Sequence, residues 1–291
     1  MKKRILVTGG AGFIGSHLCE QLLKKGNKVF CLDNFFSGKK QNIIHLIDDP
    51  SFELIEHDVI FPLPMEVDEI YHLACPGSPK YLGIDPVKTT KTCFMGTMNM
   101  LELAKNLQIK ILYSSTSEIY GYSQAHSQIE DEYGIINPFG KRACYEEGKK
   151  CAETLVMDYY RQYKLKIKLV RIFNTYGPKM LPDDGRSVST FVMQALKNEN
   201  IMIYGDGKQV RSFCYVDDLV KGLIRMMDSN DNFIGPVNLG NPDGLTISEV
   251  AKKIIRLTNS NSKIIYKNAY SAGVSIKQPD IHRAKKELKW K

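Results

Sequence analysis

The chain has 291 residues, 43% hydrophobic and 25% charged, which is typical of a globular protein with a sizeable core. No apolar run approaches the roughly 20 residues that span a membrane, and no signal peptide is recognisable, so we expect a cytoplasmic protein without a membrane partner. The net charge of +8 is dispersed rather than interleaved with aromatic residues, which excludes a nucleic-acid groove and favours a small anionic ligand. Seven cysteines without C-x-x-C spacing predict no metal site.

The N-terminal part of the chain alternates strand and helix patterns. Apolar runs predict buried strands at 3–9, 28–33, 52–58, 69–74, 110–117 and 166–174. Amphipathic patterns predict helices at about 13–25, 86–107 and 143–164. Strands that alternate with helices in this way indicate an α/β fold with a doubly wound parallel sheet.

The C-terminal part is less regular. We expect helices at about 187–198, 215–229 and 246–258, and short strands at 236–241 and 263–268. A stretch rich in Pro and Gly at 177–185 marks a boundary between lobes. The prediction is a sheet domain of residues 1–176 and a smaller substrate-binding lobe of 177–291, with part of 212–245 returning to the sheet domain.

A glycine-rich turn joins the first predicted strand to the first helix. Gly9, Gly12 and Gly15 permit a tight turn and let a pyrophosphate approach the helix N-terminus, as in dinucleotide-binding Rossmann folds. Asp33 ends the second strand, where a carboxylate accepts hydrogen bonds from an adenosine ribose and repels a 2′-phosphate, which favours NAD over NADP. Asp58 ends the third predicted strand and is placed to meet the adenine. Capping of a loop is the alternative for both aspartates.

A second constellation predicts catalysis. Tyr145 and Lys149 lie four residues apart on one helix face, and a lysine ammonium there is expected to lower the pKa of the phenol, which makes Tyr145 a candidate base. The hydroxyls of Ser115, Thr116 and Ser117 emerge at the carboxyl end of a strand, where doubly wound folds bind their ligands. Capping of the following loop is again the alternative.

Together these segments carry a family resemblance. The stretches VTGGAGFIGSHL, IYHLAC, STSEIYG, YEEGK, RIFNTYGP and YGDGKQVRSFCYVDDL resemble the extended short-chain dehydrogenases that remodel nucleotide sugars. The likeness runs from Lys3 to Trp290 and is strongest to the UDP-glucuronate decarboxylases, which produce UDP-xylose. Thr116-Ser117-Glu118 matches their pattern, whereas related 4,6-dehydratases carry Asp-Glu at the last two positions and 4-epimerases usually lack the glutamate.

The resemblance implies an enzyme that decarboxylates UDP-glucuronate through a 4-keto intermediate, with NAD recycled in place. Tyr145 takes the proton of the C4 hydroxyl, Thr116 holds that oxygen, and Lys149 supports the tyrosine. Ser117 and Glu118 orient the carboxylate or a water molecule. The resemblance also implies a homodimer formed through 86–107 and 143–164.

The same resemblance assigns the binding residues. Those expected at the cofactor are Gly9, Gly12, Phe13, Ile14, Gly15, Asp33, Asn34, Asp58, Val59, Leu73, Ala74, Thr92, Tyr145 and Lys149. Those expected at the UDP-sugar are Tyr81 and Lys88 near the glucuronate, Asn174 and Arg211 at the diphosphate, and Tyr204, Val188, Ser189 and Phe191 at the uridine, with Lys179 and Gln209 beside them. Packing in the core is the alternative for the aromatic residues.

One residue expected to contact the substrate differs from the family pattern. Lys277 stands where the decarboxylases carry an arginine that contacts the sugar carboxylate, so we expect it to attract that carboxylate through a single point contact. Cys93 stands where relatives often have asparagine. Other activities therefore stay open: a 4-epimerase, a 4,6-dehydratase, a decarboxylase of a modified UDP-uronic acid, or a non-catalytic nucleotide-sugar-binding protein.

Overall fold

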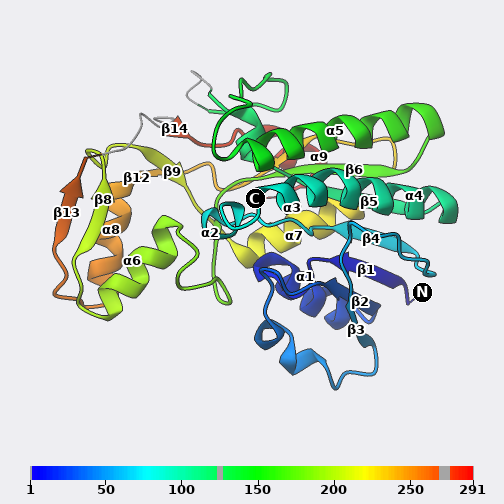
Figure 1. Ribbon diagram of the computed structural model, residues 1–291, viewed down its shortest axis with the longest axis horizontal. Helices are drawn as coiled ribbons and strands as arrows, with labels where there is room; N and C mark the ends of the chain where they lie inside the picture. The colour runs from blue at the N-terminus through cyan, green and yellow to red at the C-terminus, as the bar shows by residue number, and fades with distance from the viewer. Residues whose placement is uncertain (1, 123–126, 269–275, 291) are drawn as a thin grey trace.

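The computed structural model describes residues 2–122, 127–268 and 276–290. Its main feature is a sheet of seven parallel strands in the order β11-β6-β5-β4-β1-β2-β3 (Figure 1). The strands are β1 (Arg4–Thr8), β2 (Lys28–Asp33), β3 (Phe52–Glu56), β4 (Glu69–His72), β5 (Lys110–Thr116), β6 (Ile167–Ile172) and β11 (Val237–Leu239). The strand order reverses between β1 and β4, the crevice where doubly wound sheets bind ligands, and the predicted Rossmann fold is confirmed.

Helices cover both faces of this sheet because successive strand residues point to opposite sides. On β1, Ile5 and Val7 belong to the core under α1 (Phe13–Lys24) and α7 (Val216–Met227), which pack together. Leu6 points into the core under α4 (Thr97–Leu107) and α5 (Ala143–Tyr163).

The helix predicted at 86–107 is present but is not uniform. It consists of α3 (Pro86–Lys91), a π-helical turn at Thr92–Gly96, and α4. Such turns insert one extra residue into a helix and often occur at functional sites. A short helix, α2 (Pro79–Leu82), precedes it, and a 3-10 turn follows β5 at Ser117–Tyr120.

A smaller lobe lies at the left of Figure 1, beyond the carboxyl ends of the strands. It contains α6 (Ser187–Leu196) and α8 (Ile247–Leu257), packed over the parallel pair β8 (Ile201–Tyr204) and β13 (Ile264–Lys267). A three-stranded sheet of β9 (Val210–Ser212), β12 (Gly244–Thr246) and β14 (Ile276–Lys277) connects it to the sheet domain. Its apolar core includes Phe191, Ile203 and Ala251.

Parts of the C-terminal half return to the large sheet. Strand β11 pairs with β6, and α7 covers the sheet beside α1. Helix α9 (His282–Leu288) also packs on β11 and α7, and Trp290 belongs to the same core, so more of the chain returns than the expected part of 212–245. The short parallel pair β7 (Thr175–Tyr176) and β10 (Cys214–Tyr215) lies where the chain passes between the lobes. None of the helices in the described ranges is both long and apolar enough to cross a membrane.

Candidate active site

The glycine-rich turn after β1 leaves no space for larger side chains. Gly9 has a φ of +71°, and a Cβ built on Gly15 would lie 2.1 Å from the carbonyl oxygen of Gly9. No side chain caps the N-terminus of α1, which begins after Gly12. The first N–H groups of the helix, with its positive dipole end, are therefore free to bind an anion such as a pyrophosphate.

Asp33 lies at the end of β2 beside this turn and is buried. Its Oδ2 accepts a hydrogen bond from the Ala11 N–H at 3.0 Å, and its Oδ1 accepts one from the Phe35 N–H at 2.9 Å. Burial raises the pKa of the Asp33 carboxyl, although these backbone N–H groups act against it. A carboxylate has about four acceptor positions, so Asp33 can fix the loop and still accept hydrogen bonds from a ribose.

Asp58 and Ser189 differ from the other predicted site residues, because neither lines the pocket. The Asp58 carboxylate accepts from the Asn34 amide at 2.9 Å and pairs with Lys88 Nζ at 3.1 Å. The hydroxyl of Ser189 donates to Asp184 Oδ1 at 2.7 Å. Both side chains take part in the polar contacts of the pocket walls, and Lys88, expected near the glucuronate, pairs with Asp58, expected near the adenine.

The candidate catalytic side chains meet at the carboxyl end of β5. Thr116 and Tyr145 form a side-chain hydrogen bond, and both line the pocket. Lys149 is buried, donates to the Ser114 carbonyl at 2.7 Å, and lies 4.7 Å from the ring centre of Tyr113. In the protein alone burial raises the pKa of Tyr145, whereas the sequence predicted a lowered pKa.

A charged cluster lies next to these residues. The Glu118 carboxylate pairs with Lys277 Nζ at 2.8 Å and with the Arg142 guanidinium at 3.4 Å, and Arg142 also contacts Glu146 at 3.5 Å. Although burial acts to raise it, the pKa of Glu118 is lowered, because Lys277 and Arg142 favour the ionised form. Lys277 is thus bound to an enzyme carboxylate instead of standing free, and Arg142 is a pocket residue that the sequence did not single out.

The small lobe forms the other wall of the pocket. Its predicted contacts Tyr204, Gln209 and Arg211 line the pocket together with Val188 and Phe191. Tyr204 is 55% exposed, so packing in the core does not explain it. Gln209 Oε1 is buried and has no hydrogen-bond partner among the described residues, which is typical of a position that a ligand or water satisfies.

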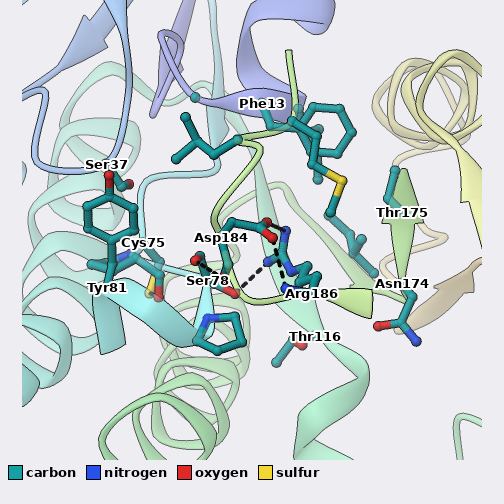
Figure 2. Close-up of a pocket in the computed structure, with 18 of the residues that line it drawn as sticks. Phe13, Ser37, Cys75, Ser78, Tyr81, Thr116, Asn174, Thr175, Asp184 and Arg186 are labelled. Carbon is teal, nitrogen blue, oxygen red and sulfur yellow. Dashed lines mark hydrogen bonds and ion pairs between the residues drawn. The ribbon is translucent and has the colours of Figure 1, made fainter. Parts of the chain in front are cut away.

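Hydrogen bonds and an ion pair fix residues 184–186 to the sheet domain (Figure 2). The Ser78 hydroxyl donates to the Asp184 carbonyl at 2.8 Å, and the Arg186 guanidinium pairs with the Asp184 carboxylate at 3.3 Å. Arg186 also donates to the Gly77 carbonyl at 2.5 Å. These contacts hold 184–186 against 77–78, so the loop that leads into α6 is fixed to the sheet domain.

The cavity that these walls enclose has a volume of about 780 Å³ and runs from the glycine turn to the small lobe. Except for Asp58 and Ser189, every side chain predicted at the cofactor or substrate lines it. These are Gly9, Gly12, Phe13, Ile14, Gly15, Asp33, Asn34, Val59, Leu73, Ala74, Tyr81, Lys88, Thr92, Thr116, Ser117, Glu118, Tyr145, Lys149, Asn174, Lys179, Val188, Phe191, Tyr204, Gln209, Arg211 and Lys277. Within the described ranges no three His, Cys, Asp or Glu side chains gather as a metal site.

Known proteins similar in sequence to this chain include UDP-glucuronic acid decarboxylases. A UDP-glucuronic acid decarboxylase 4 of Arabidopsis thaliana is 50% identical over 99% of this chain, and the chain spans 64% of that relative's length. A UDP-glucuronic acid decarboxylase 1 of Xenopus tropicalis is 48% identical over 99% of the chain and 68% of the relative. The chain therefore covers about two thirds of these proteins.

Solved structures agree on the fold. The UDP-glucose 4-epimerase of Thermotoga maritima, determined with UDP-glucose, superposes with a TM-score of 0.90 at 29% identity, over 99% of this chain and 93% of that one. The UDP-glucuronic acid 4-epimerase of Bacillus cereus, determined with UDP-glucuronic acid and NAD, gives 0.86 at 28% identity with the same coverage. The family model of the NAD dependent epimerase/dehydratase family matches residues 5–240. The chain belongs to the NAD-dependent epimerase/dehydratase family.

Proposed function

We propose that this protein converts UDP-glucuronate to UDP-xylose and CO₂. The observation that carries the proposal is the Ser117-Glu118 pair at the carboxyl end of β5. Ser117 provides no carboxylic acid to protonate a leaving hydroxyl, which a dehydratase needs, and Glu118 is held ionised by Lys277 and Arg142. Relatives about 50% identical bear the name UDP-glucuronic acid decarboxylase, which supports the same substrate.

The cofactor end fits NAD. The uncapped N-terminus of α1 suits the pyrophosphate, and Asp33 suits the adenosine ribose. NAD⁺, when bound, supplies an acceptor for the C4 hydride and returns that hydride at the end of the cycle. Because the cofactor is regenerated in each turnover, we expect the purified protein to retain it.

The chain's own groups act on the sugar. Tyr145, as the phenolate that the Lys149 ammonium favours, accepts the proton of the C4 hydroxyl while Thr116 holds the same oxygen. Oxidation at C4 produces a ketone β to the carboxylate, so the C5–C6 bond breaks with its electrons flowing into an enolate at the C4 oxygen. Tyr145 and Thr116 stabilise that oxygen by hydrogen bonds. C5 then takes a proton and the C4 ketone is reduced, which completes the conversion.

The substrate lies between the lobes in this proposal. Asn174 and Arg211 bind the diphosphate, and Tyr204, Gln209, Val188 and Phe191 form the uridine pocket. An arginine binds phosphate oxygens through two parallel hydrogen bonds, which fixes the reacting sugar toward β5.

The test is incubation with UDP-glucuronate and NAD⁺, with CO₂ measured and the product sugar identified by NMR. We expect equal amounts of CO₂ and UDP-xylose. UDP-galacturonate without CO₂ would make the protein a 4-epimerase, and a 4-keto-6-deoxy product from UDP-glucose would make it a dehydratase. Binding of UDP-glucuronate without any product, in protein loaded with NAD, would leave the non-catalytic alternative.

We also propose that two copies of the chain dimerise through α3, α4 and α5. The exposed apolar side chains here are Val87 on α3, Phe94 and Met95 in the π-helical turn between α3 and α4, and Tyr163 on α5. Light scattering after gel filtration is expected to give about twice the chain mass of 33.0 kDa. Phe94→Glu should convert the dimer to a monomer, and an unchanged mass in that variant would move the interface elsewhere.

A further inference from the structure

Two cysteines lie side by side at the wall of the pocket, and the proposed reaction uses neither. Cys75 follows β4, is partly exposed, and lines the cavity (Figure 2). Cys93 lies in the π-helical turn between α3 and α4 and is buried. Their sulfur atoms are 3.3 Å apart. A disulfide needs a distance of about 2.05 Å, so an approach of about 1.2 Å would join them.

The surroundings make Cys75 the reactive member of the pair. Although burial acts to raise it, the pKa of Cys75 is lowered, because the Cys93 thiol hydrogen-bonds to it and the Lys149 ammonium favours its thiolate. Contact with Cys75 and burial raise the pKa of Cys93. Since the thiolate is the nucleophile, the lowered pKa and the position in the pocket wall both favour Cys75 as the thiol that meets an oxidant in the pocket.

We propose that a hydroperoxide oxidises Cys75 and Cys93 to a reversible disulfide, and that this disulfide lowers turnover. The Cys75 thiolate attacks the terminal oxygen of the hydroperoxide, and the O–O bond breaks. Hydroxide leaves from hydrogen peroxide, or an alkoxide from an organic hydroperoxide, which gives a sulfenic acid at Cys75. The Cys93 thiol then attacks that sulfur; an S–S bond forms, the S–O bond breaks, and water leaves. The two thiols lose two electrons and the peroxide gains them. A dithiol reverses the reaction.

The disulfide affects catalysis because both partners adjoin the catalytic residues. A Cβ built at Gly77, two residues after Cys75, would lie 3.8 Å from the hydroxyl oxygen of Tyr145. A Cβ built at Gly148, directly before Lys149, would lie 2.9 Å from Cβ and 3.1 Å from Sγ of Cys93. Drawing the sulfur atoms together therefore moves chain at both ends of the Tyr145–Lys149 pair. A displacement of about 1 Å can cost about 100-fold in rate, and we expect a loss of about 10- to 100-fold.

The other cysteines supply the controls. Cys19 and Cys31 also contact each other, but both are fully buried under the glycine turn, so an oxidant in the pocket does not reach them. Cys151 is exposed on α5, the helix that carries Tyr145. The Cys151→Ser variant therefore tests whether an accessible thiol alone accounts for inactivation.

The experiment treats the reduced holoenzyme with hydrogen peroxide and maps its peptides without reduction. In the wild type we expect a cross-link between the peptides of Cys75 and Cys93, five free thiols where the reduced chain has seven, and recovery of activity with dithiothreitol. In Cys93→Ala we expect no cross-link, and dimedone should label Cys75, because the Cys93 thiol that resolves the sulfenic acid is absent. Cys151→Ser should behave as the wild type.

Three results would overturn the proposal. These are a map without the Cys75–Cys93 cross-link, a cross-link that leaves turnover unchanged, and reversible inactivation of Cys93→Ala equal to that of the wild type. The inhibition rests on the proposed function, whereas the peptide map does not. A protein that forms the disulfide but releases no CO₂ before oxidation would contradict the decarboxylase proposal and not the disulfide.

Discussion

The sheet domain and the small lobe hold their pocket residues in different ways. In the sheet domain, Thr116 and Lys149 are 6% and 3% exposed. The Thr116 hydroxyl accepts a hydrogen bond from the Glu118 N–H, and Lys149 donates to the Ser114 carbonyl of β5. In the small lobe, Tyr204 is 55% exposed and the strands have only two to four residues. Groups that carry out chemistry need fixed positions, whereas groups that bind a nucleotide tolerate more freedom until the ligand arrives.

Lys277 is an exception to this contrast between a catalytic sheet domain and a binding small lobe. It belongs to β14, which pairs with β9 of the small lobe, yet its ammonium binds Glu118 directly after β5. Through this ion pair the small lobe contributes a charge to the catalytic end of the pocket. The predictions below test whether the lobes divide chemistry from binding and whether Lys277 connects them.

The largest effect is expected from Tyr145→Phe in the sheet domain. Loss of a general base typically costs 10²–10⁴ in rate, while NAD retention and UDP-sugar affinity should change little. A single turnover followed by NADH absorbance measures the step directly. Tyr163→Phe, at the exposed end of the same helix, is the control and should keep the wild-type rate. Wild-type NADH formation by Tyr145→Phe would remove this residue from the mechanism.

Most of the sheet domain was predictable from local pattern. Strand β2 spans the predicted residues 28–33, and α5 ends one residue before its predicted limit. The π-helical turn at 92–96 was not predicted, because it extends a helical pattern without interrupting its apolar periodicity. The three-stranded sheet was missed because its strands have two or three residues and pair across long separations, which periodicity cannot register.

In the site, too, contacts between residues far apart in sequence could not be predicted. All but two of the residues predicted at the cofactor or substrate line the pocket, but the motifs did not reveal which side chains pair with one another. The ion pairs of Glu118 with Lys277 and of Asp58 with Lys88 join residues far apart in sequence, and the first also depends on how the two lobes pack. Arg142 lies three residues before Tyr145, directly before the predicted helix at 143–164. An arginine directly before a catalytic helix was the one available signal for it.

Lys277→Ala is expected to have the next largest effect. It should slow decarboxylation more than the first hydride transfer. A charge-assisted hydrogen bond is worth about 1.5–3 kcal/mol, so its loss should slow decarboxylation by about 10- to 100-fold. The first hydride transfer at C4 should be slowed less, and NADH should accumulate. Simultaneous NADH and CO₂ measurements on Lys277→Ala and Lys277→Arg separate the steps, and Lys277→Arg should raise the yield of xylose per oxidation. Lys208→Ala, at an exposed lysine of the small lobe, is the control. If Lys277→Ala released CO₂ as fast as the wild type, the small lobe would contribute no charge to the chemistry and would serve binding alone.

A smaller effect concerns the stability of the sheet domain. Burial lowers the pKa of His72 to about 3, and its ring lies between the hydroxyls of Thr8 at 2.7 Å and Thr97 at 3.2 Å. Since the unfolded chain takes up the proton at the higher pKa, the stabilising contribution is complete above about pH 6.5 and is lost as the pH falls. Each pKa unit corresponds to about 1.4 kcal/mol, so the loss from pH 7 to pH 5 should be about 2 kcal/mol. Urea unfolding measures it, and it should be absent from His72→Gln but present in His45→Gln, a change at an exposed histidine.

The smallest effect is expected from Gln209→Leu in the small lobe. Gln209 Nε2 donates to the Tyr204 carbonyl at 3.4 Å, whereas the buried Oε1 has no partner among the described residues and faces the predicted uridine pocket. A neutral hydrogen bond contributes about 0.5–1.5 kcal/mol, so its loss should raise KM for the UDP-sugar by about 2- to 10-fold. The turnover number should stay constant, because a contact with the nucleotide binds ground state and transition state equally. Gln162→Leu, at an exposed glutamine on α5, should change neither constant. If Gln209→Leu lowers kcat instead of raising KM, the small lobe takes part in the chemistry through Gln209 as well as Lys277, and the contrast between the two lobes does not hold.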